Sequence, residues 1–128
     1  MSYYFATTLS LPFEEAVQRV TETLKHEGFG IITEIDVKDT LKKKINVDFR
    51  DYRILGACNP ALAHEALQLE DKVGTMLPCN VVVQEISPGK TEVAAIDPVS
   101  SMMAIDNPRL KQAAEKVQGK LRRVIEAL

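Results

Sequence analysis

The chain has 128 residues, of which 45% are hydrophobic and 27% charged, and its formal net charge is −2. This length suffices for one domain with its own hydrophobic core, and the composition is typical of globular rather than disordered or fibrous proteins. The nearly neutral charge gives no bulk attraction to nucleic acid or to an anionic membrane. We therefore expect one domain over residues 1–128, with neither nucleic acid nor a membrane as partner.

The N-terminus, MSYYFATTLSLPFEEA, lacks the basic stretch and continuous apolar run of a signal peptide. No apolar run reaches the roughly 18 residues that a membrane-spanning helix needs. We expect a cytoplasmic protein. Its two cysteines are too few for a disulfide framework and would stay reduced in the cytosol.

In the first half of the chain, strand and helix patterns alternate. Residues 3–9 are rich in Tyr, Phe and Thr, which favours a strand. Pro12 then begins an amphipathic helix that Gly28 ends, because apolar residues recur between them at spacings of three and four. The segment GIITEID predicts a second strand, and Asp36 at its end is suited to cap a short helix.

The second half begins with a third predicted strand, YRILGAC, and Asn59 followed by Pro60 indicates the start of a helix. Residues 70–78 show no clear pattern. The β-rich runs CNVVVQEI and TEVAAID are joined by SPGK, which predicts a hairpin. Asn107 and Pro108 repeat the helix-start signal before a last helix with a nearly continuous apolar stripe.

This order of elements predicts an α/β fold, arranged as a two-layer sandwich. We expect a mixed sheet of about five strands with helices mainly on one face, because helices first alternate with strands and a hairpin then completes the sheet. With only about three substantial helices, the other face of the sheet is left uncovered within a monomer. We expect that face to form the surface of a homodimer.

Three motifs occur in this order along the chain: EGFGIITEIDV, ILGACNPALA and LPCNVVV. In them the chain resembles the bacterial and archaeal domain-of-unknown-function family 302, and the resemblance covers essentially the whole chain. It implies a small two-layer α/β domain that tends to form homodimers. It implies no activity. The resemblance therefore assigns no catalytic role to the motif residues Cys58, Asn59, Pro60 and Cys79.

Cys58 lies at the end of the third predicted strand, immediately before a helix. The positive end of the helix dipole and unpaired backbone N–H groups lower the pKa of a thiol placed there. The same N–H groups, from Asn59 to Ala63, form a common binding site for anions. Cysteine is also among the residues most often buried, so close packing of the helix on the strand is the simpler explanation of Cys58.

The distance between Cys58 and Cys79 depends on strand direction. Twenty residues separate them, which excludes the redox chemistry of a C-x-x-C motif. If their strands run parallel, the sulfurs lie at opposite ends of the sheet, roughly 20 Å apart. If the strands run antiparallel, the sulfurs are neighbours, and the repeated Cys-Asn pair favours this second arrangement.

We predict a homodimeric binding or accessory protein that takes a small anionic or thiol-type ligand, with Cys58 and Asn59 as the floor and Cys79 or Met102 nearby. One alternative is thiol redox or sulfur-transfer chemistry, with Cys58 as nucleophile and Cys79 as resolving partner. Another is a soft-metal site, because thiolates and the thioethers at positions 76, 102 and 103 are ligands that Cu(I) prefers. The sequence leaves the identity of any cofactor unknown and does not decide between an enzyme and a binding protein.

Overall fold

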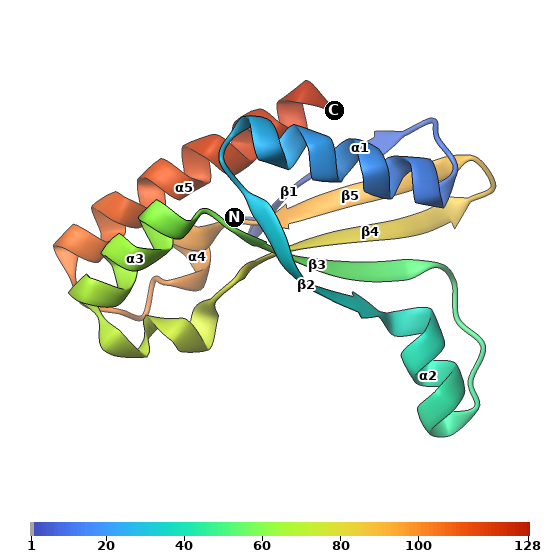
Figure 1. The fold of residues 1–128 in the computed structure, drawn as a ribbon, viewed down its shortest axis with the longest axis horizontal. Helices are drawn as coiled ribbons and strands as arrows, with labels where there is room; N and C mark the ends of the chain where they lie inside the picture. The colour runs from blue at the N-terminus through green and yellow to red at the C-terminus, as the bar shows by residue number, and fades with distance from the viewer. Residues whose placement is uncertain (1) are drawn as a thin grey trace.

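The computed structural model describes residues 2–128, which form a five-stranded sheet in the order β1-β5-β4-β3-β2 (Figure 1). The strands are β1 (Tyr4–Leu9), β2 (Gly30–Asp36), β3 (Tyr52–Cys58), β4 (Cys79–Ser87) and β5 (Lys90–Ile96). The helices are α1 (Phe13–His26), α2 (Val37–Ile45), α3 (Pro60–Leu69), the 3-10 helix η1 (Asp71–Met76), α4 (Pro98–Ser101) and α5 (Pro108–Ala127). The α/β fold with helices packed on a five-stranded sheet is confirmed.

Each pair of neighbouring strands is antiparallel, so the prediction of a mixed sheet was wrong. The reason lies in the connections. Helix α2 lies beyond one end of the sheet, and α3 with η1 lies at the other, so each connection returns the chain to the end that it left (Figure 1). Parallel neighbours need a crossover to the opposite end. Helix α1 makes such a crossover, but the two strands that it joins form opposite edges of the sheet.

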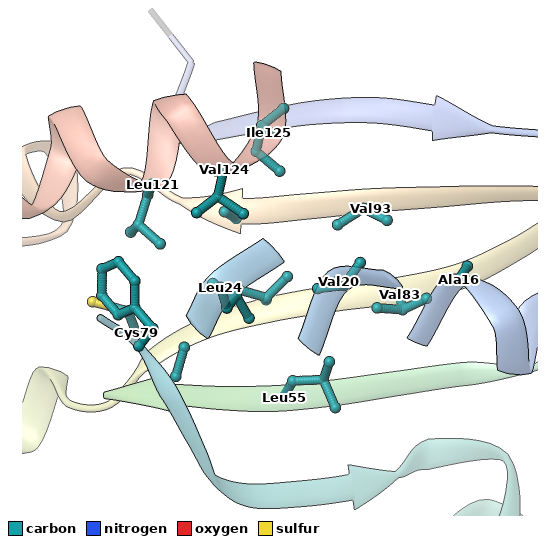
Figure 2. Close-up of a cluster of buried hydrophobic side chains, with 14 of the residues drawn as sticks. Ala16, Val20, Leu24, Leu55, Cys79, Val83, Val93, Leu121, Val124 and Ile125 are labelled. Carbon is teal, nitrogen blue, oxygen red and sulfur yellow. The ribbon is translucent and has the colours of Figure 1, made fainter. Parts of the chain in front are cut away.

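The main core lies between one face of the sheet and helices α1 and α5. Figure 2 shows Val20 and Leu24 of α1 and Leu121 and Val124 of α5 in one cluster with inward side chains of β3, β4 and β5. The inward residues alternate along each strand, as a half-covered sheet requires. They are Leu55 and Ala57 on β3, Cys79, Val81 and Val83 on β4, and Val93 and Ala95 on β5.

The opposite face of the sheet carries a row of apolar residues that runs from one edge to the other. In register, Ile35 lies opposite Ile54, Ile54 opposite Val82, Val82 opposite Ala94, and Ala94 opposite Ala6. None of these five side chains is buried, and Ile35 is 49% exposed. An apolar row at the centre of a sheet face that no helix seals is suited to contact with another surface.

Three helix starts were predicted from their capping residues, and the structure shows the expected contacts. Asp36 accepts a hydrogen bond from Asp39 N, Asn59 from Leu62 N, and Asn107 from Leu110 N. Residues 71–76, which showed no clear pattern in the sequence, form η1. Among residues 2–128, no helix has both the length and the hydropathy of a membrane span.

Candidate functional site

An apolar cavity of about 310 Å³ lies at the end of the sheet where β3 stops and β4 begins. Helix α3, the segment around η1, and α5 form its other walls, and α3 packs against both α5 and η1. Apart from Asn59 and two cysteines, the described residues that line it are apolar or glycine: Phe29, Ile32, Ala57, Leu62, Ala63, Ala66, Leu67, Gly74, Leu77, Pro78, Pro98, Met102, Leu110, Ala113, Ala114 and Val117. Its size lies within the range of small-molecule pockets.

The structure brings the four predicted site residues to this one cavity, since Cys58, Asn59, Cys79 and Met102 all line it. The cysteines meet because β3 and β4 are antiparallel. Cys79 lies directly opposite Ala57, the residue before Cys58. Cys58 and Asn59 lie where β3 leads into α3. Cys79 begins β4, and Met102 follows α4.

The two thiols differ in their surroundings. Cys58 is partly exposed, whereas Cys79 is 8% exposed and belongs to the main core. Burial, together with the neighbouring Cys58, raises the pKa of the Cys79 thiol to about 11. Because the thiolate is the reactive form, Cys79 is a poor nucleophile near neutral pH. Both cysteines are free thiols in this structure.

The polar side-chain atoms of Asn59 form hydrogen bonds within the fold. Its Oδ1 accepts from Leu62 N at 3.3 Å, and its Nδ2 donates to the carbonyl oxygen of Glu27 at 3.4 Å. The N–H of Ala63 donates to the carbonyl of Asn59 at 2.9 Å, and Pro60 has no N–H to offer. Of the five positions expected to offer an N–H to an anion at this helix start, two are already bonded and one is a proline, so the helix start is poorly suited to an anion.

The methionines expected as soft-metal ligands do not gather in one place. Met102 lines the cavity with both cysteines, whereas Met103 and Met76 do not line it. Within residues 2–128, no group of three or more His, Cys, Asp or Glu side chains is arranged to hold a metal ion.

The sequence did not indicate that α5 forms a wall of this cavity. Leu110, Ala113, Ala114 and Val117 belong to the apolar stripe that the sequence predicts for that helix. All four line the cavity. Two of them are alanines, and short side chains leave space where longer ones would fill it. The sequence does contain one signal for this wall. The apolar stripe carries alanines in its first half and the larger Leu121 and Val124 in its second half.

The fold and the cavity define a small two-layer α/β protein with an apolar site large enough for an organic molecule. The family model described as "Domain of unknown function DUF302" matches residues 5–128, so the chain belongs to this family.

A solved structure from Bacillus stearothermophilus, described as an uncharacterized conserved DUF302 protein, shares the fold. It is 29% identical to this chain, with a TM-score of 0.90, and the match covers 98% of each chain. A comparison with curated proteins found no match.

Proposed function

We propose that this protein binds a small, mainly apolar molecule in the cavity between β3, α3 and α5. The observation that carries the proposal is a lining of apolar side chains around about 310 Å³. An apolar cavity of about 150 Å³ is enough to hold benzene. A neutral thiol compound also suits this lining, whereas a free anion would lose its hydration and find few donors.

Toluene is a suitable probe, because it matches the lining and lacks a charge. Titration with toluene, followed by two-dimensional NMR of backbone amides, is expected to shift signals of α3, the first half of α5 and the start of β4. Absence of saturable shifts in the wild-type protein would contradict the proposal.

A matched pair of variants tests the location of the site. Ala63→Phe places a ring in the cavity and should abolish the toluene shifts. Ala61→Phe adds the same ring to an exposed position of the same helix, outside the cavity, and should leave binding unchanged. Equal loss in both variants would show that the helix, and not the cavity, is responsible.

We also propose that the protein forms a homodimer through the open face of the sheet. The row from Ile35 to Ala6 supports this, because it is continuous, apolar and only partly covered. In sedimentation experiments, Val82→Lys at its centre should shift the protein to monomer. Gln112→Lys, exposed on α5, should have no effect. A monomeric wild-type protein at micromolar concentration would rule this out.

A second candidate activity is thiol redox chemistry, which the shared position of Cys58 and Cys79 on one cavity favours. In this case the Cys58 thiolate attacks a substrate disulfide and releases one substrate thiol. Cys79, which reacts slowly near neutral pH because its pKa is raised to about 11, then attacks the mixed disulfide, releases the second thiol and leaves a Cys58–Cys79 disulfide. After oxidation with diamide, mass mapping should find an internal disulfide that Cys58→Ser abolishes. If both thiols stay free under these conditions, the redox activity is excluded.

A further inference from the structure

A second cavity, of about 490 Å³, lies against the first. Met102, Leu110 and Ala114 line both of them, so these three residues form the wall between the two spaces. Beyond this shared wall the second cavity has a mixed lining, in which the apolar Val99, Met103 and Ile105 lie beside polar and charged residues. The latter are Ser2, Asp97, Ser100, Lys111 and Gln118. An apolar cavity and a cavity with several polar groups thus lie side by side.

Asp97 is the most deeply buried polar group of the second cavity, with 8% exposure. Its carboxylate accepts from Val99 N at 3.0 Å, from Ser100 Oγ at 3.3 Å and from Gln118 Nε2 at 3.1 and 3.2 Å. All three donor groups are neutral. These four contacts occupy the roughly four lone-pair positions of the carboxylate, but none of them brings a positive charge to balance it, so a cationic donor that replaced a neutral one would be favoured.

Met102 is the flexible part of the shared wall. It is 9% exposed and follows directly after α4, whereas Leu110 and Ala114 are held within α5. A methionine side chain has three rotatable bonds and repacks readily around irregular spaces. Rotation of this one side chain is the smallest change that would join the two cavities.

We infer that the two cavities act as one channel for a small amphipathic amine. Its hydrocarbon body lies in the apolar cavity and its ammonium group reaches Asp97 past Met102. This inference rests on the proposed function, and it adds the polar head of the ligand and the group that recognises it. Lys111 also lines the second cavity, but it is exposed to solvent, whereas the carboxylate of Asp97 is shielded from water.

Three ligands with similar hydrocarbon chains but different polar end groups test which charge the channel prefers. They are octylamine, octanol and octanoate. By isothermal titration calorimetry, octylamine should bind roughly tenfold more tightly than octanol, because a charged hydrogen bond replaces a neutral one. Octanoate should bind most weakly. Equal affinities, or a preference for octanoate, would overturn the inference.

Two variants of the second cavity separate this inference from the proposed function. Asp97→Asn keeps a side-chain acceptor for the start of α4 and should remove the preference for octylamine over octanol. Ser100→Phe fills part of the second cavity and should weaken the binding of octylamine about tenfold. Both should leave toluene binding unchanged, since neither residue lines the apolar cavity.

The combined results distinguish the two failures. If toluene does not bind, the proposed function itself fails. If toluene binds but neither Asp97→Asn nor Ser100→Phe changes the affinity for octylamine, only the inference of a channel is wrong. Circular dichroism of each variant checks that its fold is intact, and Gln112→Asn, on the exposed side of α5, serves as the unaffected control.

Discussion

Cys79 lies directly opposite Ala57 in the ladder between β3 and β4, so the residue next to Ala57, Cys58, reaches the same cavity from the neighbouring strand. The cavity therefore has a thiol on each of two adjacent strands. One of them is partly exposed and the other is buried with a raised pKa. This difference leads to the first prediction.

Stability should fall at alkaline pH through Cys79. Its thiol has a pKa of about 11 when folded and an ordinary value of 9.0 when unfolded, mainly because burial disfavours the thiolate. Above pH 9 the unfolded chain loses this proton first, so the unfolded state binds fewer protons and is favoured. The contribution is fully present below pH 9 and is lost by about pH 11, which amounts to about 2–3 kcal/mol.

The measurement is the free energy of unfolding in urea at several pH values for wild type and Cys79→Ala. The variant is less stable at pH 8 because it leaves a small void, but the gap between the two proteins should narrow as the pH rises from 9 to 11. A constant gap would contradict the raised pKa.

Gly56→Ala should destabilise the protein by about 1–3 kcal/mol, the usual cost of overpacking. A Cβ atom at this position meets the side-chain oxygen of Thr33 and lies 2.6 Å from Cγ of Pro78. Gly30→Ala is the matched control, because nothing lies within 4 Å of a Cβ there. Chemical denaturation of both variants checks the prediction, and equal losses would show that flexibility of the chain, and not space, is at issue.

Asn107→Asp should cost about 1 kcal/mol, although Asp and Asn cap helices equally well. The reason is that Asn107 also donates from Nδ2 to the carbonyl of Leu69 at 3.0 Å, a bond that a carboxylate cannot make. Asn59 makes the equivalent bond to Glu27 at 3.4 Å, so Asn59→Asp should cost less. Thermal unfolding measures both, with Gln112→Glu as an exposed amide-to-carboxylate control. No loss at position 107 would refute the double role.

Arg53→Lys should destabilise the protein by about 1 kcal/mol, because Lys lacks the planar fork of Arg. The Arg53 guanidinium binds both oxygens of Glu14, at 2.8 and 3.2 Å, and lies 5.0 Å from the centre of the Phe13 ring. Its side chain is 15% exposed. Lys42→Met removes an exposed pair with Asp48 and should cost less than about 0.5 kcal/mol. Similar losses in the two variants, measured in urea, would contradict this reasoning.

Helix starts were predictable from the sequence because they depend on residues next to each other. Asp36, Asn59 and Asn107 each bond to an N–H within three residues, so short motifs determine them. The second bond of each asparagine reaches far along the chain, to Glu27 or Leu69, and no local pattern indicates it.

Strand directions and the cavity were not predictable in this way. The antiparallel sheet depends on the end of the sheet to which α2 and α3 return the chain. The prediction of a mixed sheet was wrong for that reason. The four residues proposed for the site do line one cavity, but the sequence did not show its apolar character. That character comes from α3 and α5, whose alanines at 63, 66, 113 and 114 meet only in three dimensions.

The position of β1 at the edge of the sheet affects how a newly made chain can fold. Tyr4 pairs with Ile96 because β1 lies beside β5, so β1 leaves the ribosome well before the strand with which it pairs has been made. Helix α5, which closes the cavity, is made later still. The nascent chain therefore has no complete cavity until α5 has been made and docks on the sheet.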